Sequence, residues 1–205
     1  MKLPHFKICL TAFAFSLFPI EAITAPVLFV DFGQHTAAPL QSGYEAFAPW
    51  GPTSADNGNP VTQAYSRSDA TDGTIEVTMA GMTHWRDYSP VVGIYASQSN
   101  LLSDMALRNS NGTMTLTIAD LKPGDYFIRT YHNNGNGQNG GIWNALITDA
   151  NRTDVSLGTF TEGPKTNSPT SVLTLLNYFT ITDGDFVLKM TRTGGNHMNL
   201  NYRRD

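Results

Sequence analysis

The stretch GTMTLTIADLKPGDYFIRTYH, residues 112–132, decides the fold class. Its first part alternates strictly, so Met114, Leu116 and Ile118 point to one face of a strand and the threonines to the other. The segment LKPG at 121–124 follows at once, and its proline and glycine favour a tight turn. The stretch therefore predicts a β-hairpin with one buried face.

The rest of the chain repeats this plan of short β-type runs between turn clusters. Asp183-Gly184 predicts a second hairpin, which joins VLTLLNYFTI to DFVLKM. One short helix is expected at 99–107, where leucines share a stripe. Strands are expected near 27–32, 61–67, 74–80, 112–119, 125–132, 142–148, 154–160, 171–181, 185–191 and 198–202. Many short strands and so little helix predict an all-β antiparallel sandwich or barrel.

The N-terminus has the composition of a secretory signal peptide. Basic residues precede Ile8–Phe18, an almost wholly apolar run of eleven residues, and small residues follow at Ala22 and Ala25. We expect residues 1–25 to be the signal, with cleavage after Ala22 left open, and 26–205 to form a single domain. The protein is therefore expected to be secreted, either to the periplasm or outside the cell.

Charge and cysteine content narrow the classes of partner. The formal net charge is −4, which argues against a nucleic-acid partner because such partners select basic patches. The apolar run is too short for a membrane span, which needs about 20 residues. The single cysteine, Cys9, lies in the expected signal, so no disulfide is expected in the exported chain.

The stretch THWRDYSP, residues 83–90, is the chemically richest part of the chain. Sugar recognition needs an aromatic face for the apolar side of a pyranose ring and planar hydrogen-bonding groups for its hydroxyls. Trp85, Arg86, Asp87 and Tyr88 supply both. The alternative interpretation is that Arg86 and Asp87 form an internal ion pair while Trp85 fills the core.

Two further places carry candidate ligand contacts. Tyr131 and His132 end a strand before the loop NNGNGQNGG, and loops often carry function, although a structural role for this histidine is the alternative. Among the other tryptophans, Trp50 lies between prolines and a glycine, which favours exposure. Trp143 lies in an alternating apolar run, which favours packing.

Metal and catalytic patterns are weak. The histidines are dispersed without zinc-type spacing, and the sequence has neither a Gly-x-Ser-x-Gly elbow nor a phosphate-binding glycine loop. The better enzyme alternative is a β-jelly-roll polysaccharide lyase, in which an arginine neutralises a uronate carboxylate while a histidine or tyrosine moves a proton. Its candidate residues are Arg86 or Arg129 with His84, His132, Tyr88 or Tyr131.

Short segments in order along the chain resemble a known family. They are VDFG at 30–33, QSGYEAF at 41–47, HWRD at 84–87, LLSDM at 101–105, LKPGDYFIRTYHN at 121–133 and MNLNY at 198–202. The sequence resembles secreted bacterial galactose-binding-like jelly-roll domains, related to malectin-like and carbohydrate-binding modules. Asn133 departs from the pattern, because an acidic residue is common there, and this weakens a metal or acid role at that point.

The resemblance implies a jelly-roll sandwich that binds a glycan. We expect no cofactor, apart from a structural calcium ion that the resemblance brings by analogy, for which Asp31, Asp183 or Asp185 offer oxygens. The expected function is a non-catalytic, carbohydrate-binding domain that recognises a glycan or polysaccharide through Trp50, Trp85, Arg86, Asp87, Tyr88, Tyr131 and His132. A lyase and a structural or adhesive surface module remain the alternatives.

Overall fold

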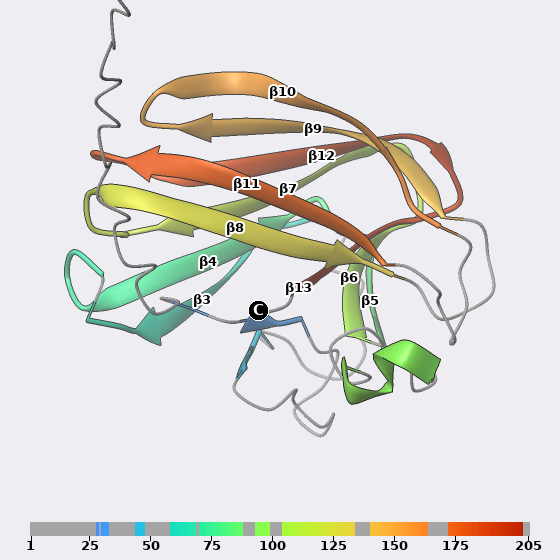
Figure 1. Ribbon diagram of the computed structural model, residues 1–205, viewed down its shortest axis with the longest axis horizontal. Helices are drawn as coiled ribbons and strands as arrows, with labels where there is room; N and C mark the ends of the chain where they lie inside the picture. The colour runs from blue at the N-terminus through green and yellow to red at the C-terminus, as the bar shows by residue number, and fades with distance from the viewer. Residues whose placement is uncertain are drawn as a thin grey trace, which may run out of the picture.

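The computed structural model describes residues 28, 30–32, 44–47, 58–68, 70–87, 93–98, 104–133, 140–163 and 172–202. In these residues almost every element is a β-strand, and most strands belong to two antiparallel sheets that face each other (Figure 1). The predicted all-β jelly-roll sandwich is confirmed.

The larger sheet has six strands in the spatial order β10-β9-β12-β7-β4-β3. The bounds of its strands are β3 Val61–Ser66, β4 Thr74–Ala80, β7 Gly112–Ala119, β9 Gly141–Asp149, β10 Arg152–Thr161 and β12 Phe186–Gly195. The smaller sheet has five strands in the order β11-β8-β13-β6-β5. Its strands are β5 His84–Asp87, β6 Asp104–Arg108, β8 Gly124–His132, β11 Leu173–Ile181 and β13 Met198–Tyr202. A separate parallel pair joins β1 Val30–Asp31 to β2 Glu45–Ala46.

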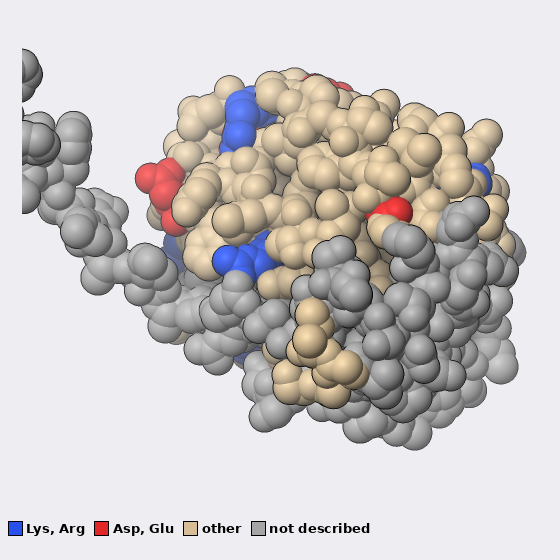
Figure 2. Space-filling model, turned by 45° about the vertical axis from the view of Figure 1, so that its right-hand side comes forward, with Lys and Arg blue, Asp and Glu red and all other residues tan. Residues whose placement is uncertain are grey.

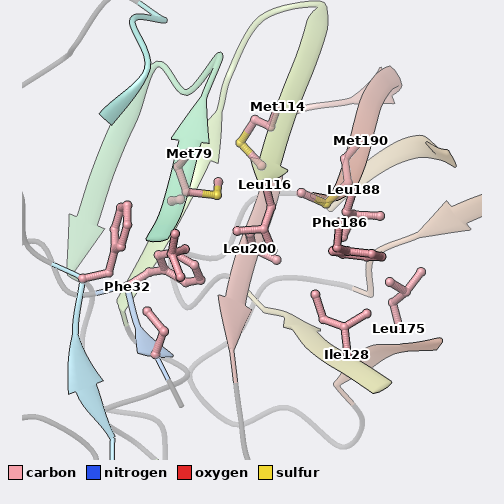
Figure 3. Close-up of a cluster of buried hydrophobic side chains, with 14 of the residues drawn as sticks. Phe32, Met79, Met114, Leu116, Ile128, Leu175, Phe186, Leu188, Met190 and Leu200 are labelled. Atoms are coloured by element: carbon pink, nitrogen blue, oxygen red, sulfur yellow. The ribbon is translucent and has the colours of Figure 1, made fainter. Parts of the chain in front are cut away.

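The hydrophobic core lies between the two sheets (Figure 3). In most strands every second side chain points into the core, since successive residues of a strand point to opposite faces. In β7, Met114 and Leu116 are buried and Ile118 packs against the core while partly buried, as the alternation predicts. Across the interior they face a second layer, made of residues such as Ile128, Leu175 and Leu200.

The predicted hairpin at 121–124 is wrong, because β7 lies in the larger sheet and β8 in the smaller one. The turn exists, but it carries the chain from one layer to the other. A loop of the larger sheet holds it: the Thr71 N–H donates to the Asp120 carbonyl at 2.7 Å, and Leu121 forms an isolated bridge with Ala70. The positive φ of this turn is at Asp120, 63°, rather than at its glycine.

The second predicted hairpin is wrong for the same reason. Gly184 has a positive φ of 78°, as a tight turn allows, but β11 before the turn and β12 after it belong to different sheets. The rings of Phe179 and Phe186 lie 4.2 Å apart between their centroids, both buried. Packing of these two rings across the interior places the strands on opposite sides of the core, so the turn forms an arch.

The predicted helix at 99–107 is wrong over 104–107. The structure has a short 3₁₀ helix, η1 Gly93–Gln98, followed by strand β6 from Asp104, and residues 99–103 lie outside the described part. A two-turn helix has little stability of its own, and β6 gains ladders with both β5 and β13. Strand pairing therefore overrides the local stripe of leucines. No helix in the described residues is long and apolar enough to cross a membrane.

Asp149 and Arg152 fasten the two sheets together at the β9–β10 turn. Arg152 donates to one Asp149 carboxylate oxygen from Nε at 3.1 Å and from Nη2 at 2.6 Å. The backbone N–H groups of Asn151 and of Thr180 in β11 also donate to this carboxylate. Burial opposes ionisation, but these donors hold the pKa of Asp149 below its usual range.

Candidate functional site

The HWRD segment forms β5, the last strand of the smaller sheet in the described part of the chain. Trp85 pairs with Ala106 and Asp87 with Asp104 across the β5–β6 ladder. Just before β5, the Thr83 N–H donates to the Leu107 carbonyl at 2.9 Å. The segment therefore runs along an edge of the sandwich and has a fixed register.

Several candidate residues of this region lie beyond what the structure describes. Trp50 and Tyr88 fall outside the described residues, and for Trp85, Arg86 and Asp87 the description covers the backbone only. Their roles as sugar contacts, and the alternative of an internal Arg86–Asp87 pair, stay predictions.

Tyr131 and His132 lie at the end of β8 and both are buried, with exposed fractions of 6% and 2%. His132 Nδ1 is hydrogen-bonded to the Asn199 carbonyl, and its Nε2 lies 2.9 Å from Thr130 Oγ1. A carbonyl only accepts, so Nδ1 carries the proton and Nε2 accepts from the threonine hydroxyl. Ligand binding by Tyr131 and His132 stays a prediction, and the burial of both side chains does not favour it.

The environment of His132 favours a neutral ring. Burial lowers its pKa to about 4, against the opposite effect of the hydrogen bond to the Asn199 backbone. The ring lies 4.6 Å from the Trp143 ring, which is fully buried and stacks on Phe160 at 4.7 Å. The prediction that Trp143 is a packing residue is confirmed.

A buried carboxylate continues this network, and it was not predicted from the sequence. Glu162 is 5% exposed, and its Oε1 accepts the Asn199 N–H at 2.8 Å. Its Oε2 accepts the Asn199 side-chain amide at 2.5 Å and the Gly141 N–H at 3.5 Å. We call Thr130, His132, Glu162 and Asn199 the polar cluster.

The polar cluster joins both sheets at one end of the sandwich. His132 and Asn199 belong to β8 and β13 of the smaller sheet, whereas Glu162 directly follows β10 of the larger one. Gly140 allows this approach, because a Cβ at that position would collide with the Glu162 backbone and Cβ. The arrangement fixes strand ends and gives the cluster a structural role.

One sequence signal points weakly toward the polar cluster, and a second points away from it. Glu162 is one of only four glutamates in the chain and is followed by a glycine. Asn199 alternates with Met198 and Leu200, which predicts that it faces outward, yet all three residues are buried. Both faces of β13 are covered, and period-2 reasoning from sequence does not detect that.

The described residues offer no evident metal centre. Among them, no three or more His, Cys, Asp or Glu side chains gather into a possible metal site. Asp31 is buried beside the core, whereas Asp183 and Asp185 are exposed at the β11–β12 arch. These donors do not fit a calcium site formed by the described residues alone, so calcium stays an untested expectation.

No protein-family model and no curated protein matches this sequence. Among solved structures, it is similar to a family 35 carbohydrate binding module from Clostridium thermocellum, with TM-score 0.37 and 6% identity, covering 69% of this chain and 95% of that one. For a CBM35 from Cellvibrio japonicus Abf62 the TM-score is 0.33 and the identity 13%, over 70% and 89% of the two chains. For Xyl-CBM35 in complex with a glucuronic acid containing disaccharide they are 0.33 and 15%, over 69% and 88%. Similarity at these TM-scores carries no argument about function.

Proposed function

We propose that this protein is a secreted, non-catalytic module that binds carbohydrate at the β5 edge of its smaller sheet. The observation that carries the proposal is the position of HWRD, which brings a tryptophan, an arginine and an aspartate to an edge strand. Among the described residues, β5 has a neighbouring strand on one side only, and we take its other side as the approach for a ligand. The binding residues in this proposal are Trp85, Arg86, Asp87 and Tyr88, with Trp50 as a second aromatic contact.

The chemistry of these residues suits sugars. An indole covers the apolar face of a pyranose ring, and guanidinium and carboxylate groups bond its hydroxyls in a fixed plane. Which glycan the module recognises depends on the spacing of these groups. A panel of polysaccharides is therefore the appropriate probe.

The lyase alternative is less well supported. Proton transfer needs a histidine or tyrosine within hydrogen-bond reach of the substrate. His132 and Tyr131 are both buried, and both nitrogens of His132 are already engaged inside the protein. Among the proton-transfer candidates that the structure describes, His84 remains, and it is only partly exposed.

The test is affinity electrophoresis of the full chain through gels that contain single polysaccharides. Trp85→Ala and Trp50→Ala should each weaken retardation about tenfold or more on the polysaccharide that binds, since each removes an aromatic contact. Ile94→Ala, at an exposed position of η1, is the matched control and should bind like the wild type. Unchanged binding by folded Trp85→Ala and Trp50→Ala proteins would refute the β5 site.

A second readout tests the absence of catalysis. Incubation with uronate polymers over a broad pH range should give no rise in the absorbance of unsaturated uronate products. A steady rise that scales with protein concentration would favour the lyase instead.

A further inference from the structure

The outer face of strands β8 and β11 exposes three large apolar side chains. Phe127 is 43% exposed, Leu176 48% and Tyr178 71%. One face of an antiparallel sheet normally packs on the core and the other carries polar residues. Here the inward residues of the same strands, such as Ile128 and Phe179, are buried as expected, so the exposed apolar set is an additional feature.

These side chains lie together on a regular ladder. β8 and β11 pair without a bulge from Leu173 to Ile181, and this register sets Phe127 directly opposite Tyr178. Their ring centroids are 6.2 Å apart, with an interplanar angle of 56°. Leu176 lies two residues from Tyr178 on the same face. We call Phe127, Leu176 and Tyr178 the outer platform.

Polar groups flank the Phe127–Tyr178 pair of the outer platform on both sides. On one side Thr180 pairs with Asp125, and the threonine hydroxyl donates to the carboxylate at 2.7 Å. On the other side Arg129 pairs with Leu176. An aromatic row therefore lies between two rows that contain hydrogen-bonding groups, which is the combination that sugar recognition needs.

We propose that the outer platform is a second carbohydrate-binding surface, which takes the apolar faces of sugar rings in an uncharged, extended polysaccharide. It lies at the β11 edge of the smaller sheet, and β5 is at the other end of the strand order. The flanking charges, one arginine and one aspartate, cancel each other, so the surface does not select a polyanion. Figure 2 shows one face of the molecule, on which the charged side chains of the described residues are scattered and form no patch of one sign.

The size of the outer platform favours a sugar over a protein. A fully buried aromatic side chain contributes 150–250 Å², so the exposed parts of the three side chains come to about 300 Å². A stable interface between proteins buries about 800 Å² on each partner. The platform is too small to hold a second copy of this chain by itself, but it is large enough for one or two pyranose rings.

The backbone under the outer platform is also suited to binding. Its two strands are held by a continuous ladder of nine residue pairs. Arg152 adds a hydrogen bond from its guanidinium to the Tyr178 carbonyl while it is paired with Asp149. The two rings therefore sit on a preorganised surface, and binding requires little ordering of the protein.

The test is a titration of the ¹⁵N-labelled full chain with cellohexaose, xylohexaose, mannohexaose and hexagalacturonate, followed by NMR. At least one neutral hexasaccharide should shift the amide signals of residues 126–129 and 176–179. Tyr178→Ala and Phe127→Ala should each weaken that binding about tenfold. Val155→Ala on β10, where the valine is 42% exposed, is the matched control and should bind unchanged.

Four outcomes would overturn the outer platform. Shifts confined to residues 84–87 would leave the proposed β5 site standing without it, and preferential binding of hexagalacturonate would contradict an uncharged ligand. A lack of response to every neutral hexasaccharide would refute it as well. Sedimentation adds an independent check, because a dimer that Tyr178→Ala dissociates would make the platform a self-association surface instead.

Discussion

Phe127 and His132 lie five positions apart in strand β8, and each is an exception to the usual distribution of residues. Apolar side chains are normally buried and polar ones exposed, but here the reverse holds. The phenylalanine is 43% exposed on the outer face, whereas the histidine is 2% exposed inside the sandwich. An apolar ring that stays in water contributes no free energy of burial to folding. Burying an imidazole costs free energy unless its nitrogens are hydrogen-bonded. The comparison separates a surface that is available for a ligand from an interior that is already saturated.

The two side chains differ in the groups that they contact. Both nitrogens of His132 are bonded within the polar cluster, and Glu162 accepts hydrogen bonds from Asn199. Among the ring contacts of the described residues, Phe127 takes part in one, a tilted contact with Tyr178. The chemical character of a residue therefore does not predict its exposure, because the polar residue is bonded inside the fold and the apolar one faces solvent.

The largest effect is expected from Glu162→Ala. This change leaves two Asn199 donors and the Gly141 N–H without their carboxylate acceptor inside the protein. Each buried group without a partner costs about 1–3 kcal/mol, so we expect the free energy of unfolding to fall by about 4 kcal/mol. Urea denaturation at neutral pH measures this loss.

Glu162→Gln is the control for the polar cluster. It keeps the shape and one acceptor oxygen, but its amide nitrogen cannot accept from Asn199, so its loss should be clearly smaller than that of the alanine variant. If Glu162→Ala unfolds at the same urea concentration as the wild type, the polar cluster does not hold the strand ends.

A somewhat smaller effect is expected from protonation of His132. Its pKa is about 4 in the folded protein and about 6.5 in the unfolded chain, so the unfolded chain binds the proton more tightly. Stability from the neutral ring is fully present above pH 6.5 and is lost as the pH falls toward 4. The difference corresponds to about 3 kcal/mol.

His132→Gln isolates this contribution. The variant should be less stable at neutral pH, because it loses the ring contact with Trp143, but its stability should change less between pH 6.5 and 4. Asp149 interferes little in this window, since its lowered pKa places its own loss at more acidic pH. Equal pH dependence in both proteins would show that His132 is not the titrating group.

Much of the fold was predictable because side-chain alternation is a local property. The runs at 61–67, 74–80 and 112–119 lie within one residue of β3, β4 and β7. The partners of strands were not predictable, because the same turn residues serve a hairpin within one sheet and an arch between two sheets. At Asp183-Gly184 the turn itself was predicted correctly, while the packing of Phe179 on Phe186 decided the topology.

Less of the candidate site followed from the sequence. Burial of His132 depends on β13, whose backbone carbonyl at Asn199 is 67 residues away along the chain. The strands β5 and β6 were missed because HWRD and DMALR show no clear alternation and are stabilised by their ladders. The exposure of Tyr178 was hidden for a different reason, because LTLLNYFTI has apolar residues on both faces of the strand.

The smallest effect on stability is expected at the outer platform, and this sharpens the contrast with the interior. Phe127→Ala removes a half-exposed ring and one cross-strand contact, so the free energy of unfolding should fall by only about 0.5 kcal/mol. Ile128→Ala, at the next position of β8 and 1% exposed, should cost about 3 kcal/mol because it leaves a cavity in the core. Urea denaturation of the two variants under the same conditions compares the two faces of one strand directly. A large loss from Phe127→Ala would mean that its ring supports the sheet, and the outer platform would then be part of the fold rather than a surface free to bind sugar.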